Sequence, residues 1–354
     1  MRYRSLAFLL FLITACQGQS QTQPSEETTP STTIDFFANP LEQSMPPVDT
    51  LFMEGAPNHI TRNIIQDRNG NLWFATFGGV IRYDGMSFEN MTEGVTDHRF
   101  FSVMEDRKGV FWLGTIGGGV FKYDGHSFEQ WTVGDGLSDK ITCIYEDSAG
   151  HIWLAGSGGM SRYDGQMLHH YTLTKDTMLA EKRPLRAARK EEILRATFEV
   201  NSIVEDRSGR FWFGTRGNTY NYDGTTFEKV KPNNQPFRNI RHILEDNDGN
   251  IWFGGNSGLW RYDGENYINI TRTFVGYIYE DRKGNIWTSS DGWSLSYYEA
   301  LDLKKDIFQP TIVKADEGMF FGILEADDGK IWAGTLNGVM TYDREQVTRY
   351  VDIR

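Results

Sequence analysis

The residues best suited to chemistry are basic side chains that recur at one place in a repeated sequence pattern. Five of them stand shortly before or at the start of predicted strands: Arg62, Arg99, Lys140, Arg238 and Arg241. Two more candidates, Arg216 and Trp293, fall in loops predicted at the same end of the fold. Guanidinium and ammonium groups bind carboxylate and phosphate oxygens, here within an acidic chain of net charge −12. This set predicts a binding site for a small anion or a carbohydrate acid, and the alternative is a set of scattered, solvated arginines.

Evidence for catalysis is limited to one histidine. His242 stands at the start of a predicted strand, with Glu245 three residues later. The chain shows no nucleophile motif and no histidine pair with metal-ligand spacing, and its Gly-Gly loops lack the Lys-Ser or Lys-Thr of a phosphate loop. Segment 67–71 lacks the further carboxylates of a calcium loop. The sequence therefore predicts no metal and no cofactor, and it favours a binding protein over an enzyme, with His242 as the single candidate base.

A motif that occurs seven times must position these candidates. Its most regular member is a tryptophan, found as Trp73, Trp112, Trp153, Trp212, Trp252, Trp287 and Trp332. A glycine stands three residues before each tryptophan, and a glutamate stands seven before, replaced by Gln66 in the first copy. An aspartate stands six before, except that Ala326 takes its place in the seventh copy. A Tyr-Asp pair follows about ten residues later in six copies.

Each copy predicts four short strands. In the first copy they cover residues 63–65, 72–76, 80–83 and 87–91, joined by turns rich in Asp and Gly. A four-stranded unit of about 40 residues cannot cover both faces of its sheet, but a ring of such units can. The sequence therefore predicts an all-β fold, a seven-bladed β-propeller of four-stranded antiparallel blades over residues 46–354, with the tryptophans between blades. Either segment 49–53 or segment 347–351 could complete the ring, and the basic candidates would surround the mouth of its channel.

One long insertion interrupts the repeats at residues 173–199. It holds seven basic and five acidic residues. Pro184 could open a helix, and Glu191 and Arg195 would then form an i,i+4 pair. We expect a helical insertion that serves as a lid, a docking element or a solvated decoration.

The repeat resembles that of a known family. The pattern Glu-Asp-x-x-Gly-x-x-Trp-x-x-Thr, followed by Gly-Gly, Tyr-Asp-Gly and Phe, runs in full from Glu105 to Phe128. It is similar to the two-component regulator propeller repeat, which builds periplasmic sensor domains of bacterial hybrid histidine kinases and also occurs in free-standing exported proteins. The resemblance implies a ligand-binding sensor or protein-docking module that acts without a signalling domain of its own.

Two alternatives come from other functional classes. The segment Gly-Asn-Ile-Trp-Phe-Gly at 249–254 is also similar to repeats of streptogramin-type lyases, propeller enzymes that use a histidine base and a metal near the channel mouth. That resemblance implies a metal-dependent lyase with His242 as base, although no matching set of partner residues is present. The other alternative is a structural scaffold in an outer-membrane assembly, with a protein as its partner. The negative charge argues against a nucleic-acid partner.

The first residues predict export and a lipid anchor. Arg2 and Arg4 precede an apolar run at 6–13, and Ile13-Thr14-Ala15-Cys16 resembles a bacterial lipobox. We expect a signal peptide at 1–15, a lipidated Cys16 and a flexible tether at 16–45, because residues 17–33 are polar and rich in Ser, Thr and Pro. Gln17, in place of an acidic residue, favours the outer membrane, with the leaflet left open. An ordinary signal peptide with a chance cysteine is the alternative.

Overall fold

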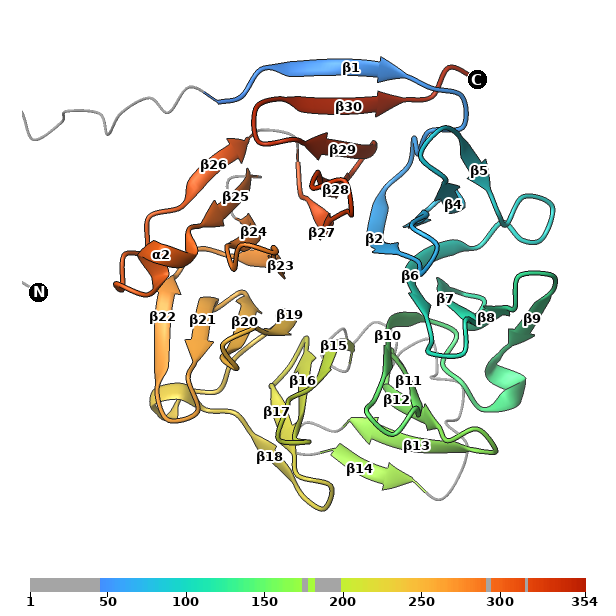
Figure 1. Cartoon of the computed structure of the whole chain (residues 1–354). Helices are drawn as coiled ribbons and strands as arrows, with labels where there is room; N and C mark the ends of the chain where they lie inside the picture. The colour runs from blue at the N-terminus through green and yellow to red at the C-terminus, as the bar shows by residue number, and fades with distance from the viewer. Residues whose placement is uncertain (1–44, 174–177, 182–198, 291–293, 316–317) are drawn as a thin grey trace, which may run out of the picture. The chain divides into compact units, whose positions relative to one another are not determined.

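Seven β-sheets follow one another along the chain (Figure 1). The computed structural model describes residues 45–173, 178–181, 199–290, 294–315 and 318–354. All seven sheets belong to one compact unit, residues 43–354. The predicted signal peptide, Cys16 and the tether up to residue 44 lie outside the described residues, and so does most of the insertion at 173–199. Within that insertion, residues 178–181 form a strand.

The first four blades are each built from consecutive strands. Blade 1 holds β2 (Thr61–Gln66), β3 (Leu72–Thr76), β4 (Gly79–Tyr83) and β5 (Phe88–Asn90). Blade 2 holds β6 (Arg99–Glu105), β7 (Phe111–Ile116), β8 (Val120–Tyr123) and β9 (Phe128–Trp131). Blade 3 holds β10 (Ile141–Glu146), β11 (Ile152–Gly156), β12 (Gly159–Tyr163), β13 (Leu168–Leu173) and β14 (Met178–Glu181). Blade 4 holds β15 (Val200–Glu205), β16 (Phe211–Thr215), β17 (Tyr220–Tyr222) and β18 (Phe227–Lys229).

The remaining three blades follow the same plan. Blade 5 holds β19 (Ile240–Glu245), β20 (Ile251–Gly255), β21 (Gly258–Tyr262) and β22 (Tyr267–Thr271). Blade 6 holds β23 (Val275–Glu280), β24 (Ile286–Ser290), β25 (Ser294–Tyr298) and β26 (Thr311–Lys314). Blade 7 holds β27 (Phe321–Glu325), β28 (Ile331–Thr335), β29 (Gly338–Tyr342), β30 (Val347–Val351) and β1 (Val48–Phe52). The described helical segments are short: η1 (Val133–Asp135), η2 (Pro232–Asn234) and α2 (Ala300–Leu303). The predicted seven-bladed propeller is confirmed.

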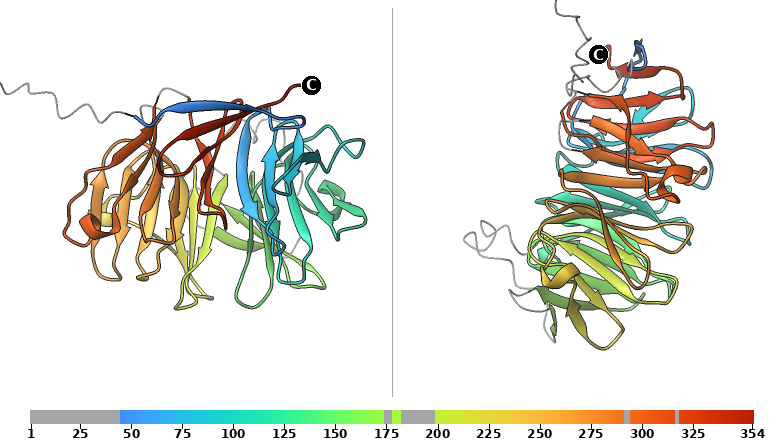
Figure 2. Two further views of the ribbon diagram at one scale, coloured as in Figure 1. Left: turned by 45° about the horizontal axis from the view of Figure 1, so that its top comes forward. Right: turned by 90° about the vertical axis from the view of Figure 1, so that its left-hand side faces the viewer.

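Both candidate closing strands are used. β30 is the fourth strand of blade 7, and β1 lies outside it as a fifth strand in parallel register, from Val48 opposite Val347 to Phe52 opposite Val351. Figures 1 and 2 show the blue strand β1 beside the dark red β30. Blades 1 and 7 also pack directly, since the Phe74 and Trp332 rings lie 5.5 Å apart. The ring is therefore closed by packing between the first and last blades, and β1 ties the start of the unit to its end.

The repeated aspartate and tryptophan form one hydrogen-bonded unit. In blade 1 the indole Nε1 of Trp73 donates to Asp67 Oδ2 at 2.8 Å, and the Asn69 and Asn71 backbone N–H groups donate to Asp67 Oδ1. The same indole bond recurs in blades 2 to 6. In blade 7, where Ala326 replaces the aspartate, Trp332 Nε1 is buried and has no hydrogen-bond partner among the described residues. These aspartates therefore close turns and fix the core tryptophans.

A belt of hydrogen bonds joins neighbouring blades. The glutamate at the end of each first strand accepts a bond from a backbone N–H in the turn of the preceding blade, as Glu105 does from Arg68 at 3.0 Å. The pattern repeats through the five following junctions. At the seventh junction Gln66 Oε1 accepts from the Asp327 N–H at 2.9 Å. The repeated glutamate, or Gln66 in blade 1, thus links each blade to the preceding one at all seven junctions of the ring.

The seven first strands face the channel, and each carries a β-bulge. In β2 the register shifts between Thr61 and Asn63, so Arg62 is the extra residue. Comparable shifts occur in the other six first strands. A bulge places two residues opposite one and changes the direction of the side chains. Two consecutive side chains of most first strands therefore line the channel.

Candidate functional site

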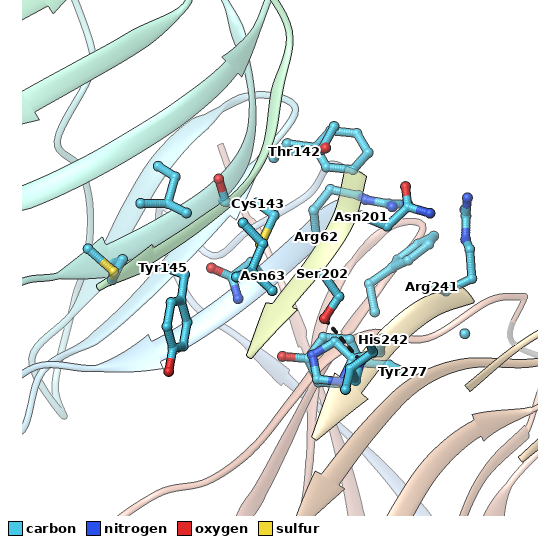
Figure 3. A pocket seen from close by; sticks show the side chains of 18 of the residues that line it. Arg62, Asn63, Thr142, Cys143, Tyr145, Asn201, Ser202, Arg241, His242 and Tyr277 are labelled. Atoms are coloured by element: carbon cyan, nitrogen blue, oxygen red, sulfur yellow. Dashed lines mark hydrogen bonds between the residues drawn. The ribbon is translucent and has the colours of Figure 1, made fainter. Parts of the chain in front are cut away.

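The channel holds a cavity of about 370 Å³ that residues from all seven blades line. This volume lies in the range of sites for small molecules, roughly 300–1,000 Å³. One level of its wall is made by residues four positions before the glutamate or Gln66 that ends each first strand: Arg62, Phe101, Thr142, Asn201, Arg241, Gly276 and Phe321. The next level is made by the residues that follow six of them: Asn63, Ser102, Cys143, Ser202, His242 and Tyr277. Figure 3 shows Arg62, Asn201 and Arg241 at one level, with Ser202, His242 and Tyr277 at the other.

Arg62 is the most unusual side chain of the first level. Its guanidinium carbon lies 4.1 Å from the centre of the Phe101 ring and 3.9 Å from that of Phe321. Its Nε is buried and has no hydrogen-bond partner among the described residues. Burial, with a further contribution from the positive charge of Arg241, lowers the pKa of Arg62 to about 9. The group is therefore still charged at neutral pH, with its faces against two rings and its edge left for other contacts.

A second group of basic side chains surrounds a buried carboxylate that itself lines the cavity. Glu199, only 6% exposed, lies 2.7 Å from Lys140 Nζ and 3.0 Å from Arg216 Nε. Arg216 and Arg241 line the cavity, and burial followed by the charge of Arg216 lowers the pKa of Arg241. Within the described ranges, no carboxylate forms an ion pair with Arg62 or Arg241, although the charge of Glu199 acts on both and partly offsets the lowering of their pKa values. The cavity therefore has more positive than negative groups along its described wall.

The second level is polar but uncharged. The rings of His242 and Tyr277 lie 4.0 Å apart, and burial lowers the pKa of His242 to about 4 while it raises that of Tyr277 to about 12. Burial also raises the pKa of the Cys143 thiol to about 12. All three side chains are therefore neutral at pH 7. His242 is poorly suited to be a general base, whose pKa is best near the working pH. The part of the chain that the structure describes holds no group of three His, Cys, Asp or Glu side chains placed for a metal ion.

The structure brings together some of the predicted site residues and separates others. Arg62, Arg216, Arg241 and His242 line the cavity. Lys140 does not line the cavity but donates a hydrogen bond to Glu199, which does. Arg99 and Arg238 are exposed and do not line it, and Trp293 lies outside the described residues. The register explains the difference, because Arg62 and Arg241 stand four residues before the end of their strands, whereas Arg99 stands six before and Arg238 seven before.

Three important residues were missed from the sequence. Phe101 and Phe321 occupy the same repeat position as Arg62, so an alignment of the seven copies on their glutamates would have placed them in the channel. Glu199 stands six residues before Glu205, the position that Lys140 has in the preceding blade. That equivalence indicates neighbouring positions, but no local signal marks Glu199 as a buried carboxylate.

Comparison with known proteins identifies the repeat. Residues 54–78, 135–158, 194–217 and 234–257 match the sequence profile of the two-component regulator propeller. No curated protein matches the chain by sequence. No described helix has the length and apolar character required to cross a bilayer.

Several solved structures share the fold. An extracellular domain assigned to a hybrid two-component system of B. thetaiotaomicron is 21% identical with a TM-score of 0.64, and the match covers 81% of this chain but 39% of that one. A catalytically inactive virginiamycin B lyase from Staphylococcus aureus, solved with quinupristin, is 12% identical with a TM-score of 0.58, covering 80% and 94%. YCF48 from Cyanidioschyzon merolae is 13% identical with a TM-score of 0.55, covering 80% and 95%. The chain therefore carries two-component regulator propeller repeats in the four matched segments, and these solved structures share its propeller fold.

Proposed function

We propose that this protein is a binding module whose channel cavity recognises a small anion. The observation that carries this proposal is the environment of Arg62, a charged guanidinium held between two phenyl rings without a carboxylate partner among the described residues. Removing a charge from water is unfavourable unless another charge or a set of hydrogen bonds compensates for it. Arg241 at the same level adds a second positive group. An anion that enters the cavity would supply the missing partner for both.

Calorimetric titration of the purified protein with acetate, glutarate, citrate, phosphate and sulfate tests this proposal. We expect at least one of these anions to bind, with an affinity that Arg62→Gln weakens by tenfold or more, since a lost charge-assisted contact costs about 1.5–3 kcal/mol. Arg238→Gln is the matched control, because Arg238 is exposed and lies outside the cavity. Absence of binding across the panel, or an equal loss in both variants, would overturn the proposal.

We further propose that the module works at the bacterial cell envelope, anchored through a lipid on Cys16 and placed in the outer membrane. The lipobox-like segment at 13–16 supports this, and the B. thetaiotaomicron structure with the same fold is an extracellular domain. Labelling of cells with a tagged palmitate, followed by membrane fractionation, provides the test. We expect label on the wild-type protein in outer-membrane fractions and none on Cys16→Ser. An unlabelled wild-type protein, released in soluble form, would refute the anchor without bearing on the channel site.

A further inference from the structure

The protonation of His242 bears on what the deeper level of the cavity can bind. Its Nδ1 is buried and has no hydrogen-bond partner among the described residues, whereas the ring itself lines the cavity. A neutral imidazole carries a single proton, on one nitrogen or the other. Orphaned buried N–H groups are rarer than under-satisfied acceptors. The favoured tautomer therefore has its proton on Nε2, which makes His242 a hydrogen-bond donor toward the cavity.

Several acceptors around the described cavity wall are engaged already, whereas Ser102 Oγ and Asn201 Oδ1 accept no bond from another described residue. Asn63 Oδ1 accepts from the Val103 N–H at 2.9 Å, and Ser202 Oγ accepts from the Ile243 N–H at 3.0 Å. Glu199 is held by Lys140 and Arg216. The donors that remain available are charged at the level of Arg62 and neutral at the level of His242. A ligand with acceptors at both levels would therefore satisfy these donors.

We propose that the ligand is a small oxocarboxylate, whose carboxylate binds at Arg62 and Arg241 and whose uncharged carbonyl oxygen accepts a hydrogen bond from His242 Nε2. This inference rests on the proposed function and adds the chemical class of the ligand. A carbonyl suits the deeper level because it accepts without bringing a second charge to a place where the neighbours Tyr277 and Ser202 are neutral. A saturated acid of the same length leaves the His242 N–H without a partner, which is the basis of discrimination.

Matched pairs of acids separate this inference from the function on which it rests. The purified protein is titrated with butyrate and 2-oxobutyrate, pentanoate and 4-oxopentanoate, and glutarate and 2-oxoglutarate. Within each pair the charge and chain length are equal, and only a CH₂ group is exchanged for C=O. We expect at least one oxo acid to bind about three- to tenfold more tightly than its partner, the difference expected for one hydrogen bond to a neutral group. His242→Phe, which keeps a ring against Tyr277, should abolish that difference, and the exposed His126→Phe should retain it.

The outcomes are distinct. If no acid binds, the proposed function fails. If acids bind through Arg62 but each pair binds equally, or the preference persists in His242→Phe, only the oxocarboxylate inference fails. If the Phe variant does not fold, ¹⁵N-histidine NMR of the wild-type protein replaces it. We then expect a neutral His242 protonated on Nε2, whose ring signals shift on addition of the oxo acid and not of its saturated partner, and a proton on Nδ1 would overturn the inference.

Discussion

The substitution Ala326→Asp should stabilise the protein, because it restores the aspartate that the other six copies of the repeat possess. The backbone of the seventh turn already has the required geometry. The Ala326 N–H donates to Lys330 O at 2.9 Å and the Gly329 N–H donates to Ala326 O at 2.9 Å, as in the turn of Asp67. Trp332 Nε1 is buried beside this turn without a described partner. The new carboxylate would therefore meet an indole N–H in the position that Asp106 occupies relative to Trp112.

The size of this effect follows from the bonds formed and the burial incurred. In blade 2 the carboxylate of Asp106 accepts from the Trp112 indole at 2.9 Å and from the Lys108 and Val110 backbone N–H groups at 2.9 Å each. Hydrogen bonds to a charged group contribute about 1.5–3 kcal/mol each, and burial of the carboxylate removes part of this gain. In the seventh turn the Lys330 N–H already donates to Asp328 Oδ1, and the nearby charges of Asp327, Asp328 and Glu325 reduce the gain further. We expect a net increase of about 1–2 kcal/mol in the free energy of unfolding.

Urea unfolding followed by tryptophan fluorescence measures this change. The reverse substitution, Asp106→Ala, serves as the matched comparison and should lower the free energy of unfolding by about 1–3 kcal/mol. A stability of Ala326→Asp equal to or below that of the wild type, with a normal loss in Asp106→Ala, would refute the idea that the Trp332 indole lacks only a carboxylate partner.

Three further predictions follow from the site and the turns. Replacing both Phe101 and Phe321 by leucine should weaken binding of the anion by about three- to thirtyfold in calorimetry, because the cation–π contacts that hold Arg62 are lost. Neither side chain is charged, so an unchanged affinity would show that the rings do not position Arg62. Anion affinity should be constant from pH 6 to 8 and fall as the pH rises through about 9, since burial lowers the pKa of Arg62 to that value and its neutral form loses the attraction. Calorimetry in that range with no such fall would contradict the lowered pKa of Arg62. Acid should unfold the protein as the pH drops below about 4. Burial alone would raise the pKa values of Asp67, Asp206 and Asp281, but the hydrogen bonds to these carboxylates outweigh it and hold the pKa values below 3.8. Stability from these groups is present above their unfolded pKa and is lost as the pH falls through the lower folded values, and a flat melting temperature between pH 5 and 2 would contradict it.

The propeller could be predicted from the sequence because each blade repeats its own turn, core tryptophan and linking glutamate. The way in which the ring closes could not be predicted, because residues 49–53 and 347–351 both fit an outer strand. The parallel pairing of β1 with β30 leaves no periodic pattern in either segment. The number of residues between each of Arg62 and Arg241 and the end of its strand predicts how deep the side chain lies in the channel. Arg99 and Arg238 also lie near the starts of their strands, but they stand six and seven residues before the closing glutamate and so do not reach the cavity.

The composition of the cavity was harder to foresee. Cation–π contacts of Arg62 join β2 to residues 39 and 259 positions away in the chain, Phe101 and Phe321. Glu199 is the last residue of an insertion without repeat character, so its burial between Lys140 and Arg216 depends on tertiary contacts alone. The orphaned Nδ1 of His242 likewise results from how neighbouring blades pack, which no pattern within one copy determines.

A crystal structure of the purified protein grown with the acid that binds most tightly in calorimetry, and of Arg62→Gln grown in the same way, tests the central claim most directly. The account predicts density for the acid in the channel, with a carboxylate within hydrogen-bond distance of the Arg62 and Arg241 guanidinium groups, and its loss in the variant. An empty channel in crystals where the acid is bound elsewhere, or an acid whose position does not change when Arg62 is replaced, would contradict it.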